Sequence, residues 1–281
     1  MASFDLVIRN GETVTATDRV RQDVGIINGQ IAALGAGLEV GQKEIDATGK
    51  LILPGGIDAH CHVEQMSSSG IMTSDDFYSA SVSAAFGGTT TIIPFAAQHK
   101  GQSLRTVVDD YMACAKPKAV IDYAFHLIIS DPTDAVMGQE LPAMIADGIS
   151  SFKIYMTYDA LKLDDYEILE VLSTARREEA LVMVHAENHD VIRWLSEKLL
   201  SEGNGDPKYH AVSHSRIAES EATHRAIALA ELVDTPLFIV HVSSEGALDE
   251  IRRSQSRGLK VMAETCPQYL FLTAKDLDKE G

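Results

Sequence analysis

Seven short apolar segments alternate with amphipathic segments along most of the chain, and this alternation limits the possible folds more than any other feature. The apolar segments are rich in β-branched residues and cover 55–62, 89–96, 122–129, 150–157, 181–187, 236–243 and 259–265. Continuous apolar runs of this length are typical of parallel strands that are covered on both faces. Helical periodicity occurs between them at 75–86, 103–115, 136–147, 164–179, 190–202, 216–233 and 245–256. In segment 164–179, for example, Tyr166, Leu169, Leu172 and Ala175 share one face of a helix.

Strands joined by helical crossovers predict an α/β fold. Seven β/α units favour a TIM-like (β/α)8 barrel in which the eighth unit is missing from the sequence. A doubly wound open sheet is the alternative, although no glycine-rich dinucleotide motif or phosphate loop follows any of these strands.

Residues 1–52 have a different character, with short strands and turns. Asn10-Gly11 and Asn28-Gly29 are strong hairpin signals between apolar runs. The sequence therefore predicts two domains. Residues 1–52 form part of a small β-sandwich, and residues 53–281 form the barrel, apparently truncated before its last strand.

Composition and charge limit the partners and the compartment. The chain has 281 residues and a net charge of −17, which argues against nucleic acid and anionic membranes as partners. No apolar run has the length of a membrane span, and the N-terminus lacks the pattern of a signal peptide. Three widely separated cysteines make no disulfide framework, so we expect a cytoplasmic protein.

Two histidines follow the first barrel strand. Because side chains alternate along a strand, His60 and His62 point to the same side and could share a divalent metal ion. A polar turn with two hydrogen-bonding histidines is the alternative on this stretch alone, since a catalytic zinc site usually needs more ligands.

Further polar residues occur at matching depths on later strands. Lys153 interrupts the apolar fourth strand, His185 ends the fifth and His241 ends the sixth. Active sites of β/α barrels lie at the C-terminal ends of the strands, so these residues and the first pair predict one metal centre. A lone strand histidine is more often a satisfied core residue, but four at one rim are hard to explain in that way. We interpret the remaining histidines as surface or structural residues: His99, His126, His210, His214 and His224.

Lys153 allows two interpretations from the residues alone. Burial and two nearby cations would favour a neutral amine, which reacts with carbon dioxide to give an anionic carbamate that can bridge two metals. Alternatively, the lysine extends outward or pairs with an acid.

Several motifs together resemble the hydantoinase/dihydropyrimidinase family of the cyclic amidohydrolases, and the resemblance covers essentially the whole chain. They are His-X-His at 60–62, "FKIYMTY" at 152–158, "HAEN" at 185–188, "HVSS" at 241–244, "AAFGGTTTIIPFA" at 84–96 and "ETCPQYL" at 264–270. The resemblance implies hydrolytic opening of a hydantoin or dihydropyrimidine ring to the N-carbamoyl amino acid, with a metal-bridging hydroxide as nucleophile.

The resemblance also implies a ligand set. His60 and His62 would bind one divalent ion, most often zinc, and His185 and His241 the other, with carbamylated Lys153 as the bridge. A homo-oligomer, tetramer or dimer, is implied as well.

Two further site assignments follow from the resemblance. Tyr158 matches the tyrosine that stabilises the oxyanion, although ordinary packing is the alternative. The segment 63–73 would contact the ring substituent through Met66, Ile71 and Met72. Flexible methionines suit bulky apolar groups, which favours aryl- or alkyl-substituted hydantoins over dihydrouracil.

The sequence departs from the family pattern at its C-terminal end. In the family, the eighth strand supplies an aspartate that binds metal and transfers a proton, and we expect it beyond Gly281, because Asp276 and Asp278 fall in a polar, helix-like segment. The sequence is thus either a fragment of a longer enzyme or an incomplete relative. Allantoinase or another cyclic amidohydrolase is the alternative activity. A non-catalytic scaffold is the second alternative, as in collapsin-response-mediator relatives, but those have lost metal ligands and all five are present here.

Overall fold

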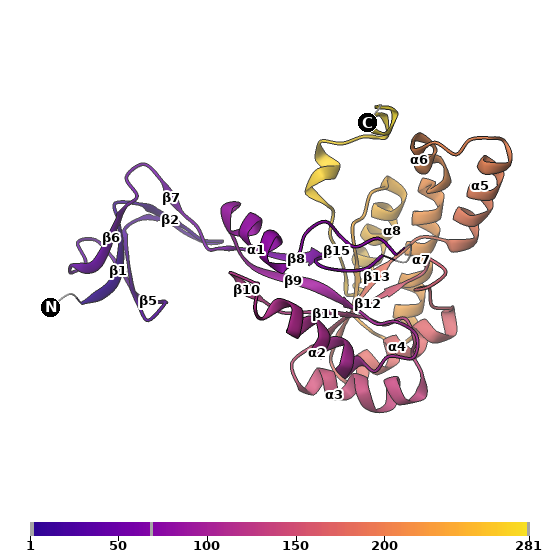
Figure 1. The fold of residues 1–281 in the computed structure, drawn as a ribbon, viewed down its shortest axis with the longest axis horizontal. Helices are drawn as coiled ribbons and strands as arrows, with labels where there is room; N and C mark the ends of the chain where they lie inside the picture. Colours follow the sequence, from indigo (N-terminus) through magenta and orange to yellow (C-terminus); the bar gives the residue numbers. More distant parts are fainter. Residues whose placement is uncertain (1–2, 68–69, 280–281) are drawn as a thin grey trace. The chain divides into compact units, whose positions relative to one another are not determined.

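The computed structural model describes residues 3–67 and 70–279. The chain forms two compact units, residues 1–57 with 88–90 and residues 58–87 with 91–281 (Figure 1). Each unit has its own sheet structure, and only the second contains the predicted metal ligands.

The first unit is built from two small sheets. Its four-stranded sheet has the order β5-β4-β1-β6, with β1 Phe4–Arg9, β4 Asp23–Ile27, β5 Gln30–Gly35 and β6 Gly41–Asp46. Its three-stranded sheet has the order β3-β2-β7, with β2 Glu12–Val14, β3 Arg19–Arg21 and β7 Leu51–Ile52.

One of the two predicted hairpins forms. Asn28 and Gly29 both have positive φ, 52° and 74°, and connect the antiparallel strands β4 and β5. The hairpin prediction at Asn10-Gly11 is wrong, because β1 and β2 belong to different sheets. A two-residue hairpin turn of this type needs positive φ at both positions. Of these two residues, only Asn10 has a positive φ, at 61°. Gly11 instead allows close packing, because a Cβ at this position would lie 2.4 Å from Cδ1 of Ile52.

The second unit contains a parallel sheet with the order β10-β9-β11-β12-β13-β14-β15, and β8 pairs with β9. The strands are β8 Gly56–Cys61, β9 Thr89–Ala97, β10 Asp122–Tyr123, β11 His126–Ile128, β12 Ser151–Tyr155, β13 Leu181–His185, β14 Leu237–Ile239 and β15 Val261–Ala263. The predicted strand 122–129 is split into β10 and β11, which both pair with β9. The sheet therefore has seven strand positions, as the sequence predicts. It curls far enough for His60, near the end of β8, to contact the side chain of Glu264, which follows β15, although β8 and β15 do not pair.

Helices connect these strands, and α2, α3 and α4 lie together along one side of the sheet (Figure 1). The helices are α1 Phe77–Phe86, α2 Leu104–Ala115, α3 Leu141–Ala146, α4 Asp165–Arg177, α5 His189–Ser201, α6 His210–Ser213, α7 Arg216–Leu232 and α8 Glu245–Ser256. A π-helical turn, Val136–Glu140, precedes α3. Short 3₁₀ turns occur at Pro207–Tyr209, Pro267–Leu270 and Ala274–Asp278.

The buried face of α4 differs from the predicted one. Its buried residues are Ile168, Val171, Leu172, Thr174 and Ala175. Tyr166, which was expected on the same face as Leu172 and Ala175, is 73% exposed and does not belong to the buried set. Asp164 and Glu167 form a capping box at the start of the helix, and the buried residues begin at Ile168.

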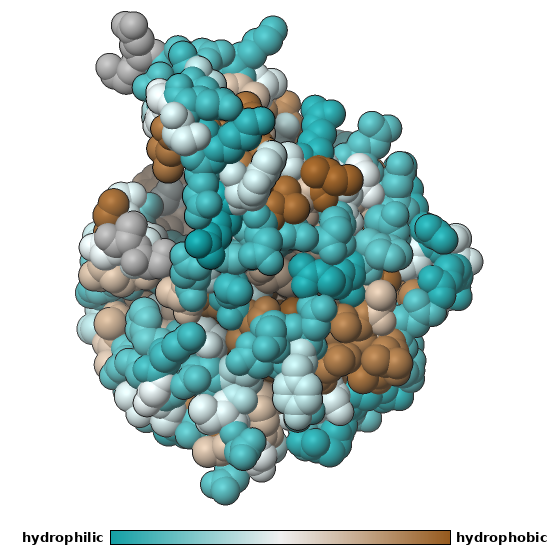
Figure 2. Space-filling model, turned by 90° about the vertical axis from the view of Figure 1, so that its right-hand side faces the viewer, coloured by the Kyte–Doolittle hydropathy of each residue, from teal (hydrophilic) through white to brown (hydrophobic). Residues whose placement is uncertain are grey.

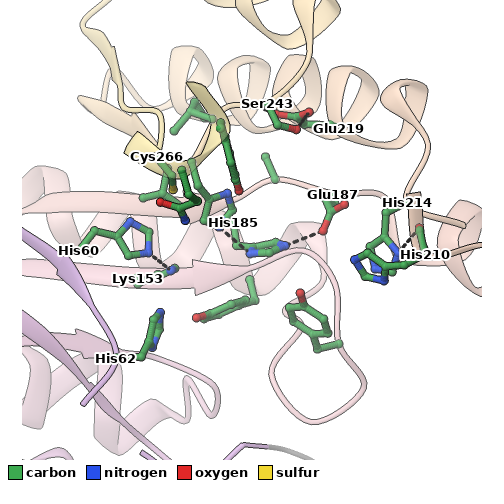
Figure 3. A pocket seen from close by; sticks show the side chains of 18 of the residues that line it. His60, His62, Lys153, His185, Glu187, His210, His214, Glu219, Ser243 and Cys266 are labelled. Atoms are coloured by element: carbon green, nitrogen blue, oxygen red, sulfur yellow. Dashed lines mark hydrogen bonds and ion pairs between the residues drawn. The ribbon is translucent and has the colours of Figure 1, made fainter. Parts of the chain in front are cut away.

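Alternation along the strands divides the apolar core into two layers. Phe152 and Ile154 of β12 belong to the large cluster that packs with the helices. Tyr155 belongs to a smaller cluster on the other face, with Phe95 and Met183. Since successive strand residues face opposite sides, Lys153 lies on this inner face. Figure 3 views the cavity on this face, in which Lys153 and the strand-end histidines lie.

Among the helices of the described ranges, none has both the length and the apolar character needed to cross a membrane. The helical face at the right of Figure 1 is mostly hydrophilic, with apolar groups gathered in separate patches (Figure 2).

Candidate functional site

A cavity of about 620 Å³ brings the predicted metal-site residues together (Figure 3). Its lining includes His60, His62, Lys153, Tyr158, His185 and His241. His60 and His185 lie at the ends of β8 and β13, the other residues except Lys153 follow β8, β12 and β14, and Lys153 lies in the middle of β12. The cavity thus lies at the C-terminal ends of the parallel strands, where β/α barrels place their active sites.

Lys153 is buried at the centre of this set, with only 1% of its surface exposed. Its Nζ lies 3.0 Å from Nε2 of His60 and 4.2 Å from the centre of the Phe95 ring. Burial lowers the pKa of Lys153 to about 7, although Glu264 opposes the shift. A large fraction of the amine is therefore neutral near neutral pH, and this is the form that can react with carbon dioxide.

The histidines approach one another closely. Nε2 of His241 lies 2.9 Å from Nδ1 of His185, and the ring centres of His60 and His241 are 5.5 Å apart. Burial, together with the neighbouring His185, lowers the pKa of His241 to about 2. Burial also lowers the pKa of His185. Both imidazoles are therefore neutral near neutral pH, which is the form that binds a metal.

The backbone is constrained at two of these positions. His241 has a φ of 42° and Tyr158 a φ of 69°, in the left-handed region that non-glycine residues rarely adopt. Such conformations are concentrated at functional sites, where the surrounding structure holds them.

The nitrogen spacings are compatible with metal ligands. Two nitrogens bound to one tetrahedral zinc ion lie about 3.3 Å apart, because each Zn–N bond is about 2.0–2.1 Å long. The imidazole nitrogens of His185 and His241, 2.9 Å apart, differ from that spacing by a few tenths of an ångström. In residues 3–67 and 70–279, however, no group of three or more His, Cys, Asp or Glu side chains forms a ready metal-binding cluster. The donor set therefore fits a metal centre only with Lys153 as a ligand and small side-chain adjustments.

Comparison with known proteins places this arrangement in a family. The model of the amidohydrolase family matches residues 51–263, most of the chain. The chain belongs to the amidohydrolase family. Amidohydrolases are generally metal-dependent, in agreement with the donor set in the cavity.

Individual amidohydrolases resemble this chain over nearly all of its length. A D-hydantoinase from Ralstonia pickettii is 45% identical over 277 residues, 98% of this chain and 60% of the relative. A D-hydantoinase from Geobacillus stearothermophilus is 48% identical over 276 residues, 97% of this chain and 58% of the relative. The crystal structure of dihydropyrimidinase from Brevibacillus agri NCHU1002 superposes with a TM-score of 0.94 at 45% identity, covering 97% of this chain and 59% of that one. The chain thus spans about 60% of the length of the curated relatives.

Three side chains that contact the predicted ligand histidines were not predicted from the sequence. Glu264 contacts Nδ1 of His60, Gln65 Oε1 lies 2.6 Å from Nδ1 of His62, and Glu187 Oε2 lies 2.7 Å from Nε2 of His185. Gln65 and Glu187 follow their histidines by three and two residues, and that short spacing was the available signal.

Two histidines expected to be surface or structural residues also line the cavity. His210 and His214 lie one helical turn apart, with ring centres separated by 4.0 Å. His126, in contrast, is buried on β11, with its ring nitrogens 2.5 Å from Ser151 Oγ and 3.1 Å from the carbonyl oxygen of Ala59, as expected for a structural residue.

The predicted substrate segment lies outside this lining. Met66, Ile71 and Met72 are 43%, 69% and 47% exposed, and none is among the described residues that line the cavity. Met66 and Met72 pair as an antiparallel bridge. Residues 68–69 of the same segment lie outside the described residues.

Proposed function

We propose that the protein hydrolyses a cyclic amide, opening a hydantoin or dihydropyrimidine ring to the N-carbamoyl amino acid. The observation that carries this proposal is the single cavity in which four strand-end histidines surround a buried, partly neutral lysine. The names of the relatives, D-hydantoinase and dihydropyrimidinase, support the same reaction. We further propose a closed (β/α)8 barrel with a small β-sandwich that includes residues 1–52.

The donor set supports a binuclear zinc site, since imidazole nitrogen is a common zinc ligand. His60 and His62 would hold one ion, and His185 and His241 the other. The neutral amine of Lys153 would add carbon dioxide and release a proton, and the resulting carbamate would supply an oxygen to each ion. When bound, two such ions lower the pKa of water, so that hydroxide is available near neutral pH.

Tyr158 supplies a hydrogen-bond donor beside this site. Burial and the nearby Glu187 raise the pKa of Tyr158, so its hydroxyl stays protonated and able to donate. A donor aimed at the oxygen of the attacked carbonyl stabilises the negative charge that develops there. The left-handed backbone of Tyr158 fixes the direction in which this side chain leaves the chain.

We also propose a preference for bulky apolar ring substituents, which Met66, Ile71 and Met72 would contact through their exposed apolar side chains although they do not line the cavity described above. We further propose that the protein is a cytoplasmic homo-oligomer, either a tetramer or a dimer.

Steady-state assays of the full-length protein with an aryl hydantoin, dihydrouracil and allantoin test the proposed reaction. We expect the aryl hydantoin to give the highest kcat/KM. Preferred hydrolysis of allantoin would replace the proposal with allantoinase activity. A folded protein that binds no metal ion and turns over none of the three would favour the scaffold instead.

Tyr158→Phe should leave the metal content unchanged and lower kcat on the order of 100- to 1,000-fold, about 3 kcal/mol, because one donor to the oxyanion is lost. Tyr166→Phe is the control, since Tyr166 is 73% exposed on α4. Both variants are compared by kcat and by metal analysis. An unchanged kcat in Tyr158→Phe would exclude Tyr158 from catalysis.

A further inference from the structure

Three of the proposed ligand histidines share one hydrogen-bonding pattern. In each, one ring nitrogen contacts an oxygen outside the ligand set: Glu264 at His60, Gln65 at His62 and Glu187 at His185. In His60 and His185, the other ring nitrogen faces a second member of the set. These contacts are spread over three separate segments of the chain.

Glu187 makes the most informative of these contacts. His185 is 8% exposed, and its Nδ1 faces Nε2 of His241 at 2.9 Å. Its Nε2 therefore points the other way, to the Glu187 carboxylate at 2.7 Å (Figure 3). The Glu187 side chain is only 17% exposed, so this contact is shielded from water.

The chemistry of imidazole gives this contact a consequence. A neutral histidine carries its proton on one nitrogen and can bind a metal only through the other. A carboxylate accepts a hydrogen bond but cannot donate one, so Glu187 requires the proton of His185 to be on Nε2. Nδ1 is then left with its lone pair directed at His241 and the centre of the site.

We propose that Glu187 is a positioning residue that fixes the tautomer and ring orientation of His185, with Glu264 and Gln65 doing the same for His60 and His62. This inference rests on the metal site proposed above. Substitution of the residues that hydrogen-bond to metal-binding histidines typically lowers metal affinity by about 10- to 100-fold.

The test compares two substitutions of Glu187 in the full-length protein. Glu187→Ala removes the acceptor, and we expect the affinity for one of the two zinc ions to fall by about 10- to 100-fold. Glu187→Gln keeps an oxygen acceptor of similar reach without the charge, and it should retain most of the affinity. Zinc affinity is measured by competition of the metal-free protein with a chromophoric chelator.

The surface pair His224 and Glu250 provides a matched control. Glu250 Oε2 lies 2.9 Å from Nδ1 of His224, which has a side-chain exposure of 61% and does not line the cavity. Glu250→Ala removes the same type of contact and should leave both zinc affinities unchanged. Thermal unfolding, followed by circular dichroism, identifies any variant that is generally destabilised.

The outcomes separate this inference from the proposed function. If the unsubstituted protein binds two zinc ions and Glu187→Ala binds both as tightly, only the positioning role is overturned. Equal losses in Glu187→Ala and Glu187→Gln would also overturn it, because charge rather than tautomer would then be responsible. An unsubstituted protein that binds no zinc would overturn the metal site itself.

Discussion

Lys153→Ala should abolish binuclear metal binding in the full-length protein. Lys153 is 1% exposed, and its Nζ lies 3.0 Å from a histidine nitrogen, so the carbamate that we propose for it would be the anion that bridges two cations. Without that anion, the repulsion between two divalent ions is not compensated. We expect about two metal ions per chain in the parent and one or none in the variant, as measured by elemental analysis after dialysis.

Short carboxylic acids extend the test of Lys153. The substitution leaves space where the lysine chain was, and acetate or propionate added to the buffer can supply two oxygens there. Metal content and ring opening should both return in part, in proportion to the acid concentration. Lys198→Ala on α5 is the control, because Lys198 lies beside Trp194 on the surface. Two tightly bound metals in Lys153→Ala without added acid would refute the bridge.

A polypeptide limited to residues 1–281 should be poorly soluble or associate with itself, and have little ring-opening activity. Among the described strands, β8 and β15 each have a neighbour in the sheet on one side only, and unpaired strand edges favour aggregation. Exposed apolar side chains add to this tendency, including Met262 on β15 at 43% and Phe271 at 81%. Sedimentation and hydrolysis of an aryl hydantoin measure the two effects.

A relative supplies the matched comparison for this experiment. The D-hydantoinase of Geobacillus stearothermophilus aligns with this chain over 58% of its length. It can be prepared complete and shortened to its aligned segment, and the shortened form should show the same loss of solubility and activity. A monomeric, fully active polypeptide of residues 1–281 would contradict both the eight-strand assignment and the expected aspartate of the eighth strand.

The seven strand positions were predictable because parallel strands buried on both faces need unbroken apolar sequence. In β13, Val182 and Val184 pack toward the helices while Met183 packs on the inner face. Both faces of such a strand are read directly from the sequence. The interruption of β12 by Lys153 was informative for the same reason, because a charge at an inner position needs an explanation.

Local signals failed where distant segments decided the structure. Asn10-Gly11 has the residues of a hairpin, but β1 pairs with β4 and β6, and no local pattern reveals those partners. The contact of Glu264 with His60 could not be predicted from local sequence for a similar reason. Glu264 follows β15 and contacts His60 only because the sheet curls, and an acid after a strand otherwise indicates a solvated loop.

The contact between His60 and Glu264 has a consequence for how the protein reaches its native state. His60 and Glu264 are 204 residues apart in the chain, and Lys153 is 93 residues from His60. Contacts between such distant segments carry a large loop-closure entropy and slow folding. In the proposed binuclear site, Lys153 of β12 would be shared by two ions, one also held from β8 and the other from β13 and the segment after β14, so full affinity would require all of these strands to be in place. Metal uptake would therefore follow the completion of folding, and the bound pair of ions would hold the first and later strands of the sheet in one cooperative unit.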